Sequence, residues 1–352
     1  MKNQAEIIDV NIFREISKSE LNKTNRFLTG WLETKWQKSQ IDEGKEYTRP
    51  WTEKGRFYAG FCETLYHVLN WYKLWKIVRF KHIGWNIDEK VVSNIKDKFN
   101  LLIKAALDDC EDSRYRGFLE KYEPQIISHY TAIDYKFQNI TGKDISNILD
   151  FGSGIGRQAF HWCSQAGINF VSVDATESLY LLQNKVYSLL FPDKLREYFY
   201  EPQRFLQDNF FASRDTLYHL PTWRLDLLPD KYFDMITCVQ VLQEISKETL
   251  HYVLSQFRRI IKKGGFLYIR DNEFWTPTHK IRVGRELFKQ GWELVFRYTG
   301  EEGKDIEGVP RLWVYTGADN NKYFSHKKRI KRAFFPTYPL RANLLKDYGL
   351  PI

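Results

Sequence analysis

Asp150-Phe151-Gly152-Ser153-Gly154-Ile155-Gly156 places three glycines directly after the apolar run at 146–150. Such a short run suits a strand buried in a parallel sheet, and we expect a helix to follow as far as Ala166. Glycines at a strand-to-helix turn let a ligand approach the backbone closely. The stretch therefore predicts a ligand-binding turn at the start of an α/β domain.

Strands and helices continue to alternate on the carboxyl side of this turn. We expect strands at 170–174, 233–239 and 266–269, with helices at 177–190 and 247–262. This alternation predicts a doubly wound, seven-stranded, mostly parallel sheet. Two further alternating runs, at 292–298 and 311–315, could close the sheet as a C-terminal antiparallel hairpin.

The chain divides into three expected regions. Residues 1–144 are predicted to be mainly helical, since apolar residues recur every three or four positions over 61–80, and to form a lid or an acceptor platform. Residues 145–317 form the α/β domain. Residues 318–352 carry 8 basic and 2 acidic residues, so this extension accounts for +6 of the net charge of +9. A basic tail could contact RNA, an acidic glycan or an anionic membrane surface.

Two details restrict the ligand of the glycine-rich turn. A dinucleotide-binding turn needs a last glycine where this chain has Arg157, and Asp150 would repel a pyrophosphate. The carboxylate suits a ligand that carries an ammonium and a sulfonium. Asp174 lies at the tip of the second strand, where a carboxylate can accept hydrogen bonds from both hydroxyls of a ribose.

These features together resemble the class I methyltransferases that depend on S-adenosylmethionine (SAM). The resemblance covers 145–317, about half the chain, and extends to Phe233-Asp234-Met235-Ile236 and to Lys262-Lys263-Gly264-Gly265. It implies that SAM is the cofactor and that its methionine part lies against Asp150, Gly152, Ser153, Gly154 and Gly156. It also implies that Asp174 and Ala175 lie at the ribose and Gln240 near the sulfonium. Thr222, Trp223 or Asp226 could contact the adenine.

Methylation of an alcohol usually needs a base within hydrogen-bond reach of the acceptor. The candidates are Asp271, Glu244 and His279, which follow the predicted fifth and fourth strands. Each has a plainer interpretation: a strand-end cap, a solvated acid at a helix start and an ordinary loop histidine. Asp271 and Glu273 could instead hold Mg²⁺, but two nearby acids are common by chance, and we expect no metal.

The preferred acceptor is a sugar hydroxyl in a glycan or its precursor, because the polar run Asp271-Asn272-Glu273 offers several hydrogen-bonding groups. Enzymes that methylate DNA bases on exocyclic amines carry an Asn/Asp-Pro-Pro-aromatic stretch where this chain reads Cys238-Val239-Gln240-Val241. The alternatives are an RNA-modifying methyltransferase anchored by the basic tail, a small-molecule N- or O-methyltransferase, and a SAM-binding scaffold without activity.

The four cysteines, Cys62, Cys110, Cys163 and Cys238, lie far apart, and none belongs to a C-x-x-C pair. This spacing favours reduced thiols in the core of a cytoplasmic protein over a zinc site. We also expect no signal peptide and no membrane-spanning helix, because the most apolar stretch, 61–78, is interrupted by charged residues.

Overall fold

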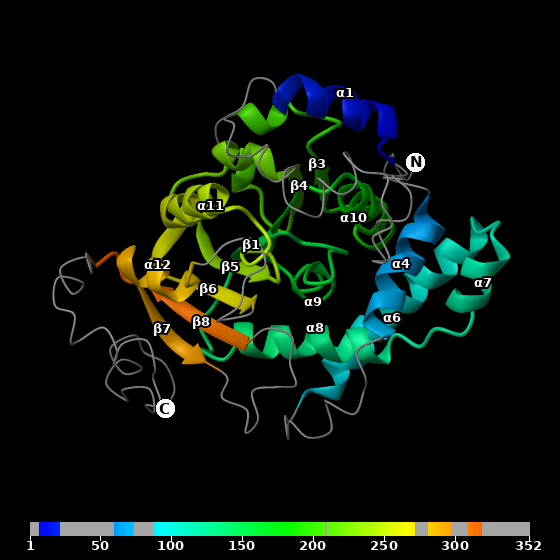
Figure 1. Ribbon diagram of the computed structural model, residues 1–352, viewed down its shortest axis with the longest axis horizontal. Coiled ribbons are helices and arrows are strands. Elements are labelled where there is room, and N and C mark those ends of the chain that lie inside the picture. The colour runs from blue at the N-terminus through cyan, green and yellow to red at the C-terminus, as the bar shows by residue number, and fades with distance from the viewer. Residues whose placement is uncertain are drawn as a thin grey trace. The chain divides into compact units, whose positions relative to one another are not determined.

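The computed structural model describes residues 7–21, 60–73, 87–207, 210–271, 281–297 and 309–318. The chain divides into two compact units. The first unit contains Met1–Lys136 and Gly152–Leu227, and the second unit contains Phe137–Phe151 and Leu228–Ile352. Most of their helices and strands are labelled in Figure 1.

Three parallel strands in the order β3-β4-β2 form the sheet portion of the first unit. They are β2 (Asn169–Asp174), β3 (Leu195–Glu197) and β4 (Leu217–Pro221). Every residue of β2 and β4 is buried, as expected for strands covered on both faces. Short 3₁₀ turns follow these strands at Arg204–Leu206, Phe210–Ala212 and Thr222–Leu227.

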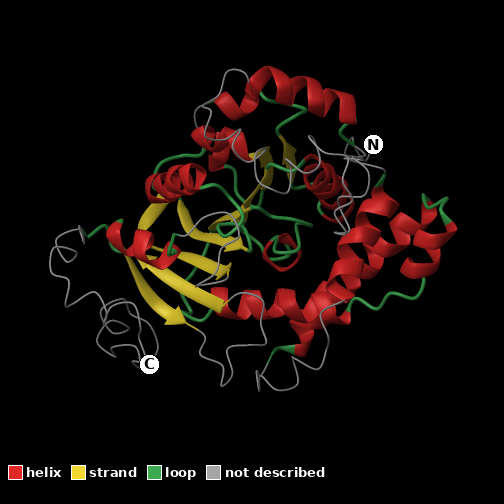
Figure 2. Cartoon of the chain, viewed as in Figure 1, coloured by secondary structure: helices red, strands yellow, loops and turns green. Residues whose placement is uncertain are grey.

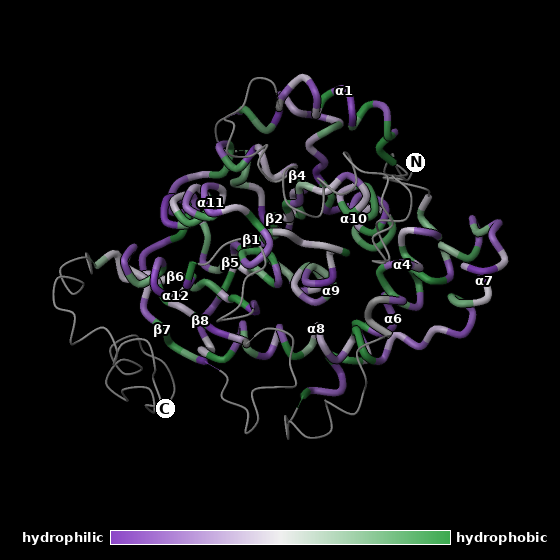
Figure 3. The backbone as a smooth tube through the Cα atoms, in the orientation of Figure 1, coloured by the Kyte–Doolittle hydropathy of each residue, from purple (hydrophilic) through white to green (hydrophobic). Residues whose placement is uncertain are grey.

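The helices of the first unit are α1 (Val10–Leu21), α4 (Phe61–Lys73), α6 (Glu89–Asp108), α7 (Ser113–Leu119), α8 (Gln125–Gln138), α9 (Ala159–Trp162) and α10 (Glu177–Leu190); the last two residues of α8 belong to the second unit. The longest, α6, begins after Asp88, whose carboxylate accepts the backbone N–H of Lys90. Figure 3 shows hydrophobic and hydrophilic residues alternating along α6. Its apolar positions, Phe99 among them, are buried, so one face of the helix joins the core.

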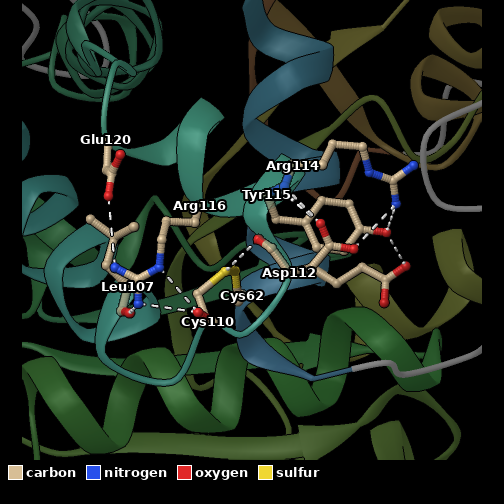
Figure 4. Close-up of a disulfide and its surroundings, with 9 residues drawn as sticks. Cys62, Leu107, Cys110, Asp112, Arg114, Tyr115, Arg116 and Glu120 are labelled. Carbon is tan, nitrogen blue, oxygen red and sulfur yellow. Dashed lines mark hydrogen bonds and ion pairs between the residues drawn. A yellow bond between two sulfur atoms is a disulfide. The ribbon is translucent and has the colours of Figure 1, made fainter.

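A disulfide joins α4 to the turn after α6. Cys62 and Cys110 are 48 residues apart, yet their Cα atoms lie 5.5 Å from each other and their sulfur atoms are bonded. Arg116 stabilises the same turn, because its guanidinium donates to the carbonyl oxygens of Leu107 and Cys110 (Figure 4). The prediction of four reduced thiols is therefore wrong for this pair, because spacing along the sequence carries no information about a contact that the helices create.

The second unit contains five strands in the order β1-β5-β6-β8-β7. They are β1 (Asn147–Phe151), β5 (Phe233–Val239), β6 (Ile261–Asp271), β7 (Trp292–Arg297) and β8 (Val309–Tyr315), with helices α11 (Lys247–Ile260) and α12 (Val283–Lys289). Strands β1, β5 and β6 are parallel, whereas β8 runs antiparallel to both β6 and β7. The arrows of β6, β8 and β7 lie side by side in Figure 2.

Two contacts show how the sequence builds this unit. The Asp234 carboxylate accepts the backbone N–H groups of Ser146 and Asn147 at 3.1 and 2.9 Å, which holds the start of β1 beside β5. Phe151 packs edge-to-face on Phe257 of α11, with ring centroids 5.1 Å apart, in the apolar core.

The predicted fold class is confirmed: the fold is α/β, and the strands are mostly parallel with an antiparallel C-terminal pair. The described residues form eight strands instead of seven, because the three-residue strand β3 is too short to show a sequence pattern. The chain also forms the outer strand β7 before it inserts β8 beside β6. None of the described helices has the length and hydropathy needed to cross a membrane. The basic extension lies outside the described residues except at its first position.

Candidate cofactor and active site

The glycine-rich turn has the backbone conformation that its sequence predicts. Gly152, Gly154 and Gly156 have φ angles of 71°, 59° and 76°, a region that side chains with a Cβ rarely enter. A Cβ added to Gly156 would lie 2.5 Å from the Tyr187 hydroxyl, so a larger residue would have to displace the Tyr187 ring. The N–H groups of Gly152 and Ser153 donate to the Val173 carbonyl at 2.9 and 3.2 Å, which fixes the turn against β2.

Asp174 ends β2 and is 3% exposed. Its Oδ2 accepts the backbone N–H of Gly154 at 2.9 Å and the side-chain amide of Gln183 at 3.1 Å. Its Oδ1 accepts the N–H groups of Ala175 and Thr176 at 2.8 and 3.0 Å. Burial raises the pKa of this carboxyl, while the four hydrogen bonds favour its ionised form. Because a carboxylate offers about four acceptor positions, a ribose hydroxyl would have to share or replace one of these donors.

The three residues that could contact the adenine differ in their surroundings. Thr222 follows β4, and its buried hydroxyl has no hydrogen-bond partner among the described residues, so it can serve a ligand. Trp223 is 4% exposed, and its indole N–H donates to Glu20 of α1 at 2.9 Å. The third candidate, Asp226, is paired with Arg224 at 3.2 Å.

Two carboxylates gather where parallel strands of the second unit end. Asp150 of β1 is 2% exposed, and its Oδ1 accepts the hydroxyl of Thr237 at 2.6 Å. Asp271 ends β6, is fully buried, and accepts the backbone N–H of Leu242 at 3.1 Å. Burial, followed by the charges of Asp271 and Asp150, raises the pKa of the Cys238 thiol well above its ordinary value. Two acids around one thiol suit a positively charged ligand better than a diphosphate.

Burial raises the pKa of Asp271 itself to about 6. The positive charge of Arg311 and the backbone N–H groups of 240–242 work against this rise. Its Oδ2 holds Leu242, as a strand-end cap would, whereas Oδ1 has no hydrogen-bond partner among the described residues. The carboxyl can therefore cap the loop and still accept a proton.

Gln240 and Glu244 lie in the loop between β5 and α11 and are partly exposed. Gln240 has a φ of 60°, which is uncommon for a residue with a side chain and recurs where backbones are held for a function. Its N–H donates to the carbonyl of Arg270 at 3.0 Å, and the N–H of Glu244 donates to Val241 at 2.9 Å. His279 and Glu273 lie outside the described residues.

Sequence reasoning missed two polar residues beside the predicted acids. Thr237 pairs in register with Asp150, so the alternation of β1 and β5 could have pointed to it. Gln183 contacts Asp174 from α10, and no signal in the sequence marks it. No group of three potential metal ligands occurs within the described part of the chain.

Comparisons with known proteins place the chain in a family. A family model described as a methyltransferase domain matches residues 116–302, just over half of the chain. A search of curated proteins found no match. Solved structures are similar to the chain only at a low level. Phosphoethanolamine N-methyltransferase 1 of Haemonchus contortus, solved with phosphoethanolamine and S-adenosylhomocysteine, is 12% identical with a TM-score of 0.40, over 67% of this chain and 54% of that one.

Two further structures show the same level of similarity. The N-methyltransferase NodS of Bradyrhizobium japonicum WM9, bound to S-adenosylhomocysteine, is 12% identical with a TM-score of 0.37, over 63% of this chain and 98% of that one. The [4+2]-cyclase SpnF is 13% identical with a TM-score of 0.37, over 53% of this chain and 82% of that one. Likeness at this level says nothing about the acceptor. The family match, together with the glycine-rich turn and its two acids, means that the chain belongs to the methyltransferase domain family and is a SAM-dependent methyltransferase.

Proposed function

We propose that this methyltransferase acts on a hydroxyl group of a sugar, in a glycan or its precursor, and that Asp271 is the general base. The observation that carries the proposal is the state of Asp271: a buried carboxyl with a pKa of about 6 and one oxygen that has no hydrogen-bond partner among the described residues. Such a base is ionised at neutral pH and still basic enough to take a proton as an oxygen nucleophile attacks.

We keep the cofactor residues that the sequence predicts. The cationic methionine part of SAM would lie near Asp150 and the glycine-rich turn, and its ribose near Asp174. Thr222, whose hydroxyl has no hydrogen-bond partner among the described residues, is the preferred adenine contact, and Gln240 is the preferred residue near the sulfonium. The cofactor supplies an electrophilic methyl group when it is bound. The residues of the chain would orient the acceptor hydroxyl, exclude water and remove its proton.

The choice of a sugar rests on the polar run 271–273, since a sugar needs several hydrogen-bonding partners at once. The test is to incubate the protein with methyl-labelled SAM and separate pools of glycans, small metabolites, protein and RNA. We expect the label in a glycan fraction. Label that enters only RNA would favour the alternative in which the basic tail anchors RNA, and label only in protein or amines would equally contradict the proposal.

Asp271→Asn should then lower kcat by about 100-fold, the lower end of what a general base contributes. The pH profile gives the sign: wild-type activity should rise as the pH increases through about 6, where Asp271 loses its proton, and the variant should lack this rise. The affinity for S-adenosylhomocysteine should stay within about twofold, because an asparagine can still accept the Leu242 N–H.

Glu244→Gln is the matched control, since Glu244 is the other described candidate for the base. It should leave the pH profile unchanged. A larger loss of kcat in Glu244→Gln than in Asp271→Asn, or an unchanged rise near pH 6 in Asp271→Asn, would show that Asp271 is not the base.

A further inference from the structure

The side chain of Gln183 on α10 connects the glycine-rich turn to Asp174. Its amide nitrogen donates to the Gly154 carbonyl at 2.6 Å and to Oδ2 of Asp174 at 3.1 Å. The side chain is fully buried. Both partners are acceptors, so the nitrogen of the amide must face them and its oxygen must face the other way.

The amide oxygen of Gln183 faces two donors. The Ser172 hydroxyl lies 3.2 Å from it, and Nε2 of His219 lies 3.0 Å from it. Because the oxygen can only accept, Nε2 of His219 carries a proton. The opposite ring nitrogen, Nδ1, lies 2.6 Å from the buried carboxylate of Glu197, so a second proton lies between these two atoms.

Two further donors hold the Glu197 carboxylate in place. Its carboxylate accepts the hydroxyl of Tyr180 at 2.6 Å and the amide of Asn184 at 3.0 Å. The stacked rings of Tyr180 and His219, whose centroids are 3.9 Å apart, hold the imidazole in one plane. A buried polar chain of this length is tolerated only when each member finds its partners, and it then has a single arrangement.

We propose that Gln183 is a positioning residue for the cofactor: it holds the Asp174 carboxylate and the Gly154 carbonyl where the ribose needs them. The Glu197–His219 pair fixes which end of the Gln183 amide faces the turn. The inference rests on the proposed placement of the ribose at Asp174.

The test compares three full-length variants by calorimetric titration with S-adenosylhomocysteine. Gln183→Met removes the hydrogen bonds to Gly154 and Asp174 and should weaken binding by about tenfold, equivalent to one lost hydrogen bond to a charged group. Gln183→Glu places a second carboxylate against Asp174, so one of the two must bind a proton. Its binding should weaken further between pH 6 and pH 8, whereas the dissociation constant of Gln183→Met should follow the wild type across this range.

Gln158→Glu is the matched control. Gln158 is buried in the same unit, and its amide also donates to a buried aspartate, Asp134, at 3.1 Å. The control carries the same new charge but does not touch Asp174, so its affinity should stay within about twofold at both pH values. A pH dependence in Gln158→Glu equal to that in Gln183→Glu would assign the effect to buried charge and overturn the proposal.

Two outcomes separate this inference from the proposed ribose site. If Asp174→Ala weakens binding while Gln183→Met and Gln183→Glu bind like the wild type, Gln183 does not position the acid and only this inference fails. If Asp174→Ala also binds like the wild type, the ribose lies elsewhere and the placement itself fails. Thermal unfolding of each variant establishes that it is folded, and Gln183→Met, which adds no charge, keeps the test decisive if Gln183→Glu does not fold.

Discussion

Replacing Asp134 with alanine should lower the free energy of unfolding by about 3–5 kcal/mol, the range for removing one partner of a buried ion pair. Asp134 is fully buried, and its Oδ2 lies 2.6 Å from the guanidinium of Arg157, which is 5% exposed. Thr131 and Gln158 also contact the pair, at 3.3 Å from Arg157 and 3.1 Å from Asp134. The alanine variant leaves the Arg157 charge buried without its carboxylate.

Urea denaturation measures this loss of stability, and two further variants serve as controls. Glu123→Ala breaks the exposed pair with Lys96, in which Glu123 is 82% exposed, and should cost at most about 0.5 kcal/mol. The double variant Asp134→Leu/Arg157→Met removes both charges and should recover much of the stability, because apolar groups can replace a buried pair. A loss in Asp134→Ala as small as that in Glu123→Ala would mean that the pair is open to water.

Removing the disulfide should lower the free energy of unfolding by a similar amount. Cys62 and Cys110 are separated by 48 positions in the sequence, and a cross-link over this separation is expected to stabilise the folded state by about 4 kcal/mol through the entropy of the unfolded chain. The double variant Cys62→Ser/Cys110→Ser should unfold at a correspondingly lower urea concentration. A reducing agent should destabilise the wild type by the same amount and leave the double variant unchanged.

Thiol counting gives the direct check. Denatured without reductant, the wild-type protein should react at two thiols, those of Cys163 and Cys238, which are buried in the folded chain. Four reactive thiols, together with an unfolding midpoint that does not respond to reductant, would contradict the disulfide.

The turn around Gly154 could be predicted because its chemistry is local. A strand, three glycines with positive φ and the acids that flank them lie within 25 residues, from Asp150 to Asp174. The backbone requirement is therefore visible in the residue types themselves. The outer strands were predicted in the same way, from alternation, although their order in the sheet was not.

Contacts between distant segments were not predictable. Glu20 accepts the indole N–H of Trp223 from 203 residues away, a contact that the sequence does not indicate. Gln183 and His219 meet from a helix and a strand 36 residues apart. The sequence pointed to Asp271 by its place at a strand end, yet its burial and its pKa of about 6 depend on the packed unit around it. His279 and the basic tail lie outside the described residues and stay predictions.

The central claim is that Asp174 receives the ribose of SAM, and calorimetry with S-adenosylhomocysteine tests it most directly. The wild type should bind one equivalent of this ligand. Asp174→Ala should remain folded and bind more weakly by about 1–3 kcal/mol, a factor of about 5 to 150 in the dissociation constant. Equal affinity in the two folded proteins would contradict the claim.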